Sequence, residues 1–199
     1  KAADVKTAFL DGHTVWTATD NIKVFYNGTS VEAELKTGEN TSSATFEAAV
    51  GTATDYYAVY PASETASMAE GVITVTLPAN QDGSFGAGHV AVAKAADKTF
   101  TFTNVNAFLK MTFASAKYTR IVVESVGGQA LAGDLTVTFA DGAAVIGSTY
   151  ANTSSTVEVT SDEAFAAGDL YISVLPGVTH TQGVLVSCYN GSEKVGAYL

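Results

Sequence analysis

The stretch that decides the fold reads Asp55-Tyr56-Tyr57-Ala58-Val59-Tyr60-Pro61 and, after a small polar insert, Gly71-Val72-Ile73-Thr74-Val75-Thr76-Leu77-Pro78-Ala79-Asn80-Gln81. The first run is rich in tyrosine and valine and the second in β-branched residues, and both compositions favour β-strands. Proline has no N–H to donate to a neighbouring strand, so Pro61 and Pro78 mark the ends of the two strands. The stretch contains no catalytic pattern and predicts architecture rather than chemistry.

Composition limits the classes to which this chain can belong. At 199 residues it has room for one large β domain or two small ones. Hydrophobic residues make up 47% and charged residues 15%, which favours a packed core over disorder. The net charge is −10 and Arg120 is the single arginine, so nucleic acid and anionic membrane surfaces are poor partners.

Neither a membrane span nor a signal peptide is visible in the sequence. No apolar run reaches the ~18 residues of a transmembrane helix. Because the chain begins at Lys1 rather than Met, we expect a processed product. The abundance of Thr, Ser, Gly, Ala and Tyr with little charge is typical of exported β-proteins.

Three predicted hairpins have Asn-Gly or Asp-Gly between strand-like runs, and these dipeptides tolerate the positive φ angles of tight turns. In Leu135–Phe139 the apolar side chains of residues 135, 137 and 139 alternate with threonines, as expected for a strand with one buried face. The predicted pairs are Ile22–Tyr26 with Ser30–Leu35, Leu135–Phe139 with Ala143–Ile146, and Val184–Tyr189 with Glu193–Tyr198; their turns are Asn27-Gly28, Asp141-Gly142 and Asn190-Gly191.

Long runs with a 3.6-residue apolar period are missing, and short β-like runs separated by turn signals favour a sandwich or barrel. Two helical turns are possible, Phe46–Val50 and Asp162–Ala167, the second with Ser161 placed to cap it. The further predicted strands are Ala44–Ala48, Tyr56–Tyr60, Val72–Leu77, Val90–Ala93, Thr99–Thr103, Phe108–Ala114, Arg120–Ser125, Ser155–Val159 and Tyr171–Leu175.

Two segments of the chain have similar sequences, and this similarity bears on domain organisation. Phe46-Glu47-Ala48-Ala49 leads to the strand ending at Pro61, and Phe165-Ala166-Ala167-Gly168 leads to a similar strand ending at Pro176. One interpretation is chance similarity between two strands. The other is a duplicated β-sandwich with a short joint at Ser115-Ala116-Lys117. The second predicts an all-β, antiparallel fold with domains at residues 1–116 and 117–199.

The order of these signals resembles the fimbrillin-like proteins of Bacteroidetes, which include major and minor fimbrial subunits, tip proteins and anchors. The resemblance extends over nearly the whole chain, and its specificity lies in the ordered set rather than in one motif. The residues that carry it are Trp16-x-x-x-Asp20-x-Ile22-x-Val24-Phe25, Ala44-Thr45-Phe46, Asp55 to Pro61, Gly71-Val72-Ile73 through Leu77-Pro78-x-x-Gln81, Phe100-x-Phe102-x-Asn104-Val105-x-Ala107-Phe108-Leu109-Lys110, Leu131-Ala132-Gly133, and Leu170-Tyr171 through Leu175-Pro176-Gly177.

The resemblance implies two tandem β-sandwich domains of transthyretin-like type. It also implies export as a lipid-anchored precursor, display at the outer membrane or fimbrial surface, and a role as a pilus subunit, tip or anchor in adhesion or assembly. Its implied partners are other fimbrial subunits or a second copy, joined by strand exchange, and host or bacterial surface glycans or proteins. An open sheet edge can serve this role because it offers unpaired N–H and C=O groups to an incoming strand.

The residue types that usually carry chemistry form no recognisable site here. His13, His89 and His180 lack metal-ligand spacing, and we expect each in a loop or at the surface. The other candidates also have structural interpretations: Asp162-Glu163 as the first turn of a short helix, Gly83 to Gly88 as a flexible surface loop with no helix after it, and Cys188 as a small buried hydrophobe. We therefore predict no catalytic, cofactor-binding or metal-ligating residue and expect a protein that is not an enzyme.

Aromatic side chains give the alternative hypothesis, a glycan-binding β-sandwich module of an outer-membrane polysaccharide-uptake system. Flat rings stack on sugar faces, and the candidates are Trp16, Tyr56, Tyr57, Tyr60 and Tyr150. Strand alternation favours core packing for Trp16 and for alternate residues of Tyr56–Tyr60. Tyr150 lies in a polar stretch, so we expect it to be the most exposed of the five.

Overall fold

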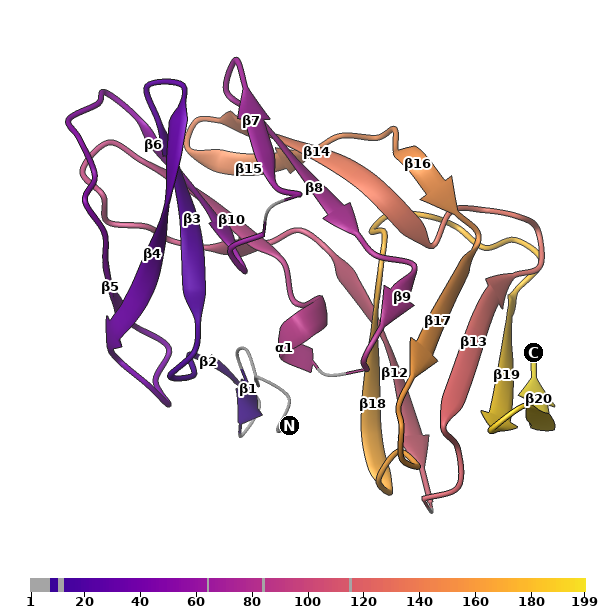
Figure 1. Ribbon diagram of the computed structural model, residues 1–199. Coiled ribbons are helices and arrows are strands. Elements are labelled where there is room, and N and C mark those ends of the chain that lie inside the picture. Colours follow the sequence, from indigo (N-terminus) through magenta and orange to yellow (C-terminus); the bar gives the residue numbers. More distant parts are fainter. Residues whose placement is uncertain (1–7, 11–12, 64, 84, 115) are drawn as a thin grey trace. The chain divides into compact units, whose positions relative to one another are not determined.

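The computed structural model describes residues 8–10, 13–63, 65–83, 85–114 and 116–199 (Figure 1). These residues form short strands joined by turns, and their one helix is the four-residue α1 (Phe85–Gly88). The predicted all-β class is confirmed. Most strand pairs are antiparallel, whereas β9 (Asn80–Gln81) and β17 (Thr156–Thr160) run parallel.

The chain forms two compact units that are interleaved in sequence. Unit 1 comprises Lys1–Val75, Phe85–Val105 and Thr136–Gly147, and unit 2 comprises Thr76–Ser84, Asn106–Leu135 and Ser148–Leu199. The strands β8 (Val72–Leu77) and β14 (Ala132–Ala140) each contribute residues to both units. The predicted division into β-sandwich domains at residues 1–116 and 117–199 stays a prediction.

The main element of unit 1 is a six-stranded sheet with β6 (Tyr56–Tyr60) inside it. Strand alternation places Tyr56, Ala58 and Tyr60 on one face, where they are buried in a core cluster. Val59 points to the opposite face and is also buried, so the strand is covered on both sides. The strand order is β11 (Thr103–Asn104), β10 (Ala91–Ala95), β6, β3 (Asn21–Tyr26), β4 (Thr29–Thr37) and β5 (Thr45–Glu47).

Two further groups of strands pair separately from the six-stranded sheet. β1 (Ala8–Leu10) and β2 (His13–Val15) form a short hairpin. A further sheet has the order β15 (Ala143–Ile146), β14, β8 and β7 (Ser67–Ala69), and β16 (Ala151–Ser154) also pairs with β14.

Unit 2 contains a five-stranded sheet and a two-stranded sheet that share one core. Ile121 and Val123 of the larger sheet cluster with Leu170 and Ile172 of the smaller one, and their apolar burial holds the two layers together. The five-stranded order is β20 (Glu193–Tyr198), β19 (Val184–Asn190), β13 (Arg120–Ser125), β17 and β9, and the two-stranded sheet joins β12 (Ala107–Phe113) to β18 (Gly168–Val174).

The segment around Gln81 ties the two layers of unit 2 together. Its backbone lies in β9, parallel to β17. Its side-chain Nε2 donates to the carbonyl of Ser173 at 2.8 Å, and its Oε1 accepts from the N–H of Ser173 at 2.9 Å. The amide of Gln81 therefore occupies the hydrogen-bonding groups of β18 as a neighbouring strand would, and it blocks that edge at Ser173.

All three predicted hairpins form, but the third turn is shifted by one residue. Tyr26 pairs with Thr29 and Ala140 with Ala143, which leaves Asn27-Gly28 and Asp141-Gly142 as the turns with positive φ. In the third hairpin Asn190 pairs with Glu193, so the turn residues are Gly191 and Ser192. A register shift at Cys188/Tyr189 accompanies this change.

Several local predictions were wrong. The segments 48–50 and 162–167 are not helical, and 99–102 form no strand, because Phe100 and Phe102 pack against the core cluster of unit 1 instead. The glycine-rich segment predicted to be a loop contains α1. The other predicted strands form with ends that differ by up to a few residues at Ala44–Ala48, Val90–Ala93, Phe108–Ala114, Ser155–Val159 and Tyr171–Leu175.

Gly83 provides a test of this packing. It has φ +79°, and an added Cβ would lie 2.4 Å from Leu170 Cδ1 and 2.9 Å from Val159 Cγ1, both in the buried core of unit 2. Gly83→Ala should therefore lower the free energy of unfolding in urea by about 1–3 kcal/mol more than Gly128→Ala. Gly128 is the matched control because it has φ +74° and open space around it. Equal losses in both variants would contradict the packing argument.

Candidate functional site

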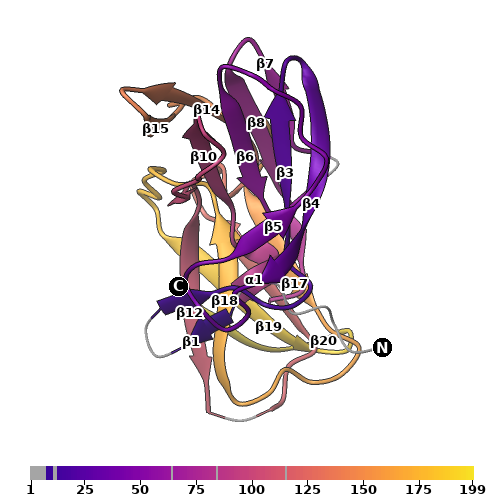
Figure 2. The same ribbon diagram turned by 90° about the vertical axis from the view of Figure 1, so that its left-hand side faces the viewer.

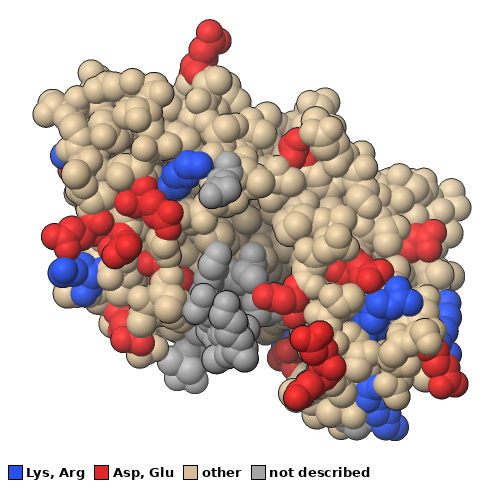
Figure 3. Space-filling view, viewed as in Figure 1, with Lys and Arg blue, Asp and Glu red and all other residues tan. Residues whose placement is uncertain are grey.

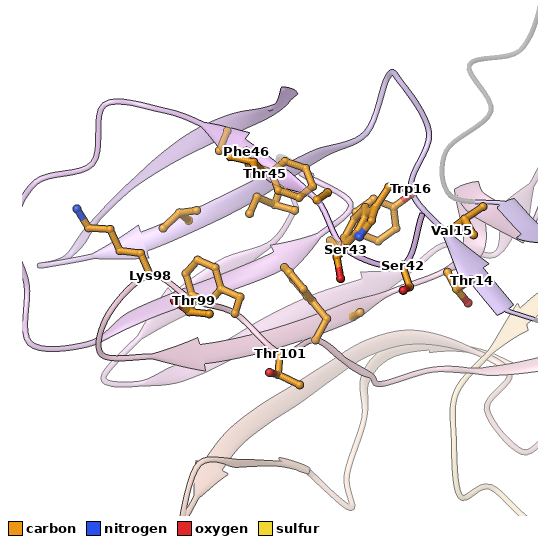
Figure 4. A pocket seen from close by; sticks show the side chains of 18 of the residues that line it. Thr14, Val15, Trp16, Ser42, Ser43, Thr45, Phe46, Lys98, Thr99 and Thr101 are labelled. Atoms are coloured by element: carbon orange, nitrogen blue, oxygen red, sulfur yellow. The ribbon is translucent and has the colours of Figure 1, made fainter. Parts of the chain in front are cut away.

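Unit 1 has a cavity of about 770 Å³, partly open to solvent, against one face of its six-stranded sheet (Figure 4). The sheet side is formed by small or branched residues of β3, β4 and β10, with Tyr60 of β6 beside them. The rest of the lining comes mainly from loops, together with β2 and the edge strands β5 and β11 of the sheet. It is formed by segments 14–16, 42–50 and 98–104, which bring side chains from three distant parts of the chain together.

Aromatic rings form one wall of this cavity. The ring of Trp16 lies edge-on to Phe46, Tyr60 and Phe102, with centroid distances of 5.0, 5.2 and 5.7 Å. Phe100 is 6.1 Å from Phe102 and extends the cluster. Such edge-to-face contacts are the favoured geometry for aromatic pairs, so the rings hold one another in place.

Backbone hydrogen bonds fix the position of Trp16. Its N–H donates to the carbonyl of Thr41 at 3.0 Å, and its carbonyl accepts from the N–H of Asn40 at 2.8 Å. The loop that supplies these partners turns at Gly38, where φ is +100° and an added Cβ would lie 2.2 Å from the carbonyl oxygen of Ser43. Glycine is therefore required at Gly38 to place Trp16.

A buried polar group supports the inner end of the cavity. Asp20 is 1% exposed, and its carboxylate accepts from the hydroxyl of Tyr60 at 2.9 Å and from the N–H of Thr17 at 2.7 Å. Hydrogen bonds to a charged acceptor compensate for its removal from water. Asp20 therefore fixes the ring of Tyr60 from below rather than offering a free carboxylate to a ligand.

His89 lies in the loop between α1 and β10, as one part of the expectation had it, but its side chain is buried rather than at the surface. Its Nε2 is 2.6 Å from Asn104 Oδ1, and its ring stacks on Phe85 at a centroid distance of 5.3 Å. Burial lowers the pKa of His89, and the bond to Asn104 and the charge of Asp20 oppose this effect only in part. The imidazole is therefore neutral at pH 7, and His89 adds no charge to the cavity.

Lys98 is the one charged residue among the described residues that line the cavity. Its Nζ lies 5.2 Å from the ring centroid of Tyr56 and 3.4 Å from the carbonyl oxygen of Val50. It forms no ion pair with any described residue. One end of an otherwise neutral cavity thus carries a positive charge.

The five aromatic candidates from the sequence do not form one exposed surface. Trp16 and Tyr60 line the cavity, and Tyr56 is buried beside it. Tyr57 lies on the other face of the sheet, with its ring 5.7 Å from Phe139. Tyr150 is half-buried and its hydroxyl donates to the carbonyl of Pro176, so it is less exposed than predicted.

The remaining candidates stay apart from one another. The side chain of His13 lies outside the described residues, and His180 is half-buried with its Nδ1 2.9 Å from Ser125 Oγ. Asp162 and Glu163 are exposed, and Cys188 is buried as predicted, with the pKa of its thiol raised by burial. Within the described ranges, no cluster of acidic, histidine or cysteine side chains could hold a metal ion. The same residues include no helix long and apolar enough to cross a membrane.

A second feature is the outer edge of β12 in unit 2. Figures 1 and 2 both show β12 beside β18, and all seven residues of β12 pair with it. In the described part of the chain β12 has no strand on its other side. The core-facing side chains of Leu109, Met111 and Phe113 pack against the core of unit 2 and remain only partly buried.

Several other edges in the structure are less suited to accept a strand. β5, β7, β9 and β11 have three residues or fewer, and β20 combines a register shift with the charged Glu193 and Lys194. Figure 3 shows acidic side chains gathered over β4 and β5, where Glu34 lies opposite Glu47. Short length, bulges and charge are the means by which proteins protect sheet edges. By contrast, β12 is regular in register and carries the single charge of Lys110.

The pKa of His89 predicts a pH dependence of stability. Because the folded pKa lies below the unfolded value of about 6.5, protons bind preferentially to the unfolded chain as the pH falls below that value. The free energy of unfolding should therefore decrease between pH 8 and pH 5.5, and His89→Gln should reduce this decrease. Urea titrations of the wild type and of His89→Gln at both pH values measure it. An unchanged slope in His89→Gln would contradict the assignment.

Comparison of the chain with protein-family models, with curated proteins and with solved structures found no match.

Proposed function

We propose that this protein is a cell-surface protein of fimbrillin type that acts in adhesion or fimbrial assembly by accepting a strand at the edge of β12. Tandem sandwiches of transthyretin-like type, export as a lipid-anchored precursor and display at the outer membrane are parts of this proposal. The ordered set of sequence signals supports the family, and the open edge of β12 is the observation that carries the mechanism.

The geometry of β12 favours strand addition for two reasons. An incoming strand would pair with backbone groups on the side of β12 away from β18, and this pairing requires no particular side chains. The same strand would also cover the partly buried side chains of Leu109, Met111 and Phe113, and removing apolar surface from water is favourable. Both contributions come from one contact, so they reinforce each other.

The two-stranded layer accepts a partner on one side only. Gln81 already occupies the backbone N–H and carbonyl of Ser173 on β18. The outer face of the layer is fixed by Lys110, whose Nζ is 2.7 Å from Asp169, and by Thr112, whose hydroxyl donates to the same carboxylate at 2.6 Å. A strand from a second copy or another fimbrial subunit would therefore enter beside β12.

The glycan-binding alternative also stays a prediction, and its five aromatic candidates do not form one common surface. Of its five aromatic residues, Tyr56 and Tyr60 are buried, and Tyr57 and Tyr150 have intramolecular ring or hydroxyl contacts. Trp16 and Tyr60 both line the cavity, but Tyr60 is fully buried, and the single ring of Trp16 does not make an extended sugar platform.

The test of strand addition compares two lysines at adjacent positions on β12. Met111→Lys places a charge on the core-facing side, where an added strand would bury it, and inward-pointing charges block edge pairing. Thr112→Lys places the same charge on the exposed outer face. For the mature protein recovered from cells without heating, Met111→Lys should shift sedimentation and unheated SDS gels to the monomer. Thr112→Lys should keep the wild-type assembly.

Hydrogen exchange then locates the contact. Backbone amides of Ala107–Phe113 should exchange more slowly in the assembled form than in the Met111→Lys monomer, with circular dichroism confirming that both are folded. A wild-type protein that stays monomeric would refute assembly. Assembly with unchanged exchange in β12 would place the contact at a different edge and refute this mechanism.

A further inference from the structure

We infer that the cavity of unit 1 binds an elongated apolar carboxylate, of which a medium-chain fatty acid is the simplest example. This site is independent of strand addition, because every residue that lines it belongs to unit 1. Three observations carry the inference: the size and form of the cavity, the chemistry of its wall, and the charge at one end.

The cavity has the dimensions of a ligand site. Its volume of about 770 Å³ lies within the ~300–1,000 Å³ typical of small-molecule pockets. Figure 4 shows its side chains in an extended row, with Lys98 at one end and Thr14 at the other. A long, narrow ligand fits such a row better than a compact one.

The wall favours apolar over polyhydroxylated ligands. Trp16, Phe46, Phe100 and Phe102 offer ring surface, and apolar contact with them needs no hydrogen bond. The polar atoms behind the rings already have partners: the hydroxyl of Tyr60 binds Asp20, and His89 binds Asn104. No buried side-chain nitrogen or oxygen of the described residues lacks a hydrogen bond. The preference for an apolar chain comes from these four rings, because the rest of the lining includes the hydroxyls of Thr14, Ser42, Ser43, Thr45, Thr99 and Thr101.

The charge at the end of the row selects a carboxylate. The whole chain has 20 acidic and 10 basic residues, yet the described lining contains Lys98 and no Asp or Glu. Lys98 is exposed and its charge is not paired with a described carboxylate, so it can meet an anionic head group while water still reaches both. A chain among the rings and a carboxylate at Lys98 satisfy both ends of the cavity.

The first experiment uses Trp16, the single tryptophan of the chain, as the reporter. Dodecanoate, dodecanol and dodecyltrimethylammonium are titrated below their aggregation concentrations, with fluorescence and calorimetry in parallel. Dodecanoate should bind saturably and most tightly, and dodecyltrimethylammonium most weakly. Across octanoate, decanoate and dodecanoate, each added CH₂ should tighten binding about fourfold until the cavity is filled, as expected for burial of about 0.8 kcal/mol per CH₂.

Variants then test which part of the cavity binds the carboxylate and which binds the apolar chain. Lys98→Met keeps the aliphatic stem and should weaken dodecanoate about three- to fivefold, the effect expected of an exposed ion pair, without changing dodecanol. Lys98→Arg should retain wild-type affinity, and Lys194→Met in unit 2 is the matched control that changes neither ligand. Ala48→Leu, which reduces the cavity, should weaken dodecanoate and dodecanol alike while circular dichroism stays native.

Two results would overturn the inference. One is the absence of saturable binding in both fluorescence and calorimetry. The other is equal affinity for the three head groups that is unaffected by Lys98→Met. The Met111→Lys monomer should bind dodecanoate as the wild type does, so this measurement and that of strand addition can fail independently.

Discussion

The constraint on which unit 1 depends is the burial of β6 on both faces. Tyr60 is completely buried on one face and Val59 almost completely on the other, so neither side of the strand can be left to solvent. On the face of Tyr60, the sheet contributes small residues such as Ala33 and Ala91, whereas the covering loops contribute large rings such as Trp16 and Phe102. The rings pack against one another on one side and the small or branched residues of the sheet lie on the other, and the cavity lies between them.

Much of the fold follows from local patterns in the sequence. The alternation in Leu135–Phe139 and the turns at Asn27-Gly28 and Asp141-Gly142 act over a few residues, and the structure contains them where they were predicted. What failed depended on strand register and pairing, which the turn and alternation signals do not specify. Asn190-Gly191 has the same turn signal, but the register shift in β19 moved the turn by one residue. The parallel pairing of β9 with β17 joins residues far apart in sequence, and no local pattern indicates it.

The candidate sites were less predictable than the fold. Strand alternation correctly favoured packing over exposure for Tyr56 and Tyr60. It could not indicate that segments 14–16, 42–50 and 98–104 meet over the same sheet face. His89 illustrates the limit well, because a lone histidine in a glycine-rich stretch gives no sign of the stacking on Phe85 that buries it. The alternation of residues in β12 indicated a strand. Only the order of strands in the sheet shows that β12 has no neighbouring strand on one of its two sides among the described residues.

The burial of Cys188 has a practical consequence for the study of the two units. It is the single thiol of the chain and belongs to unit 2, whereas the single tryptophan belongs to unit 1. The unmodified protein therefore carries one native optical reporter and one native chemical reporter, each in a different unit. Thiol labelling during denaturation would record the opening of unit 2 while emission records that of unit 1. Coincident transitions would identify one cooperative folding unit, and separate transitions would identify two.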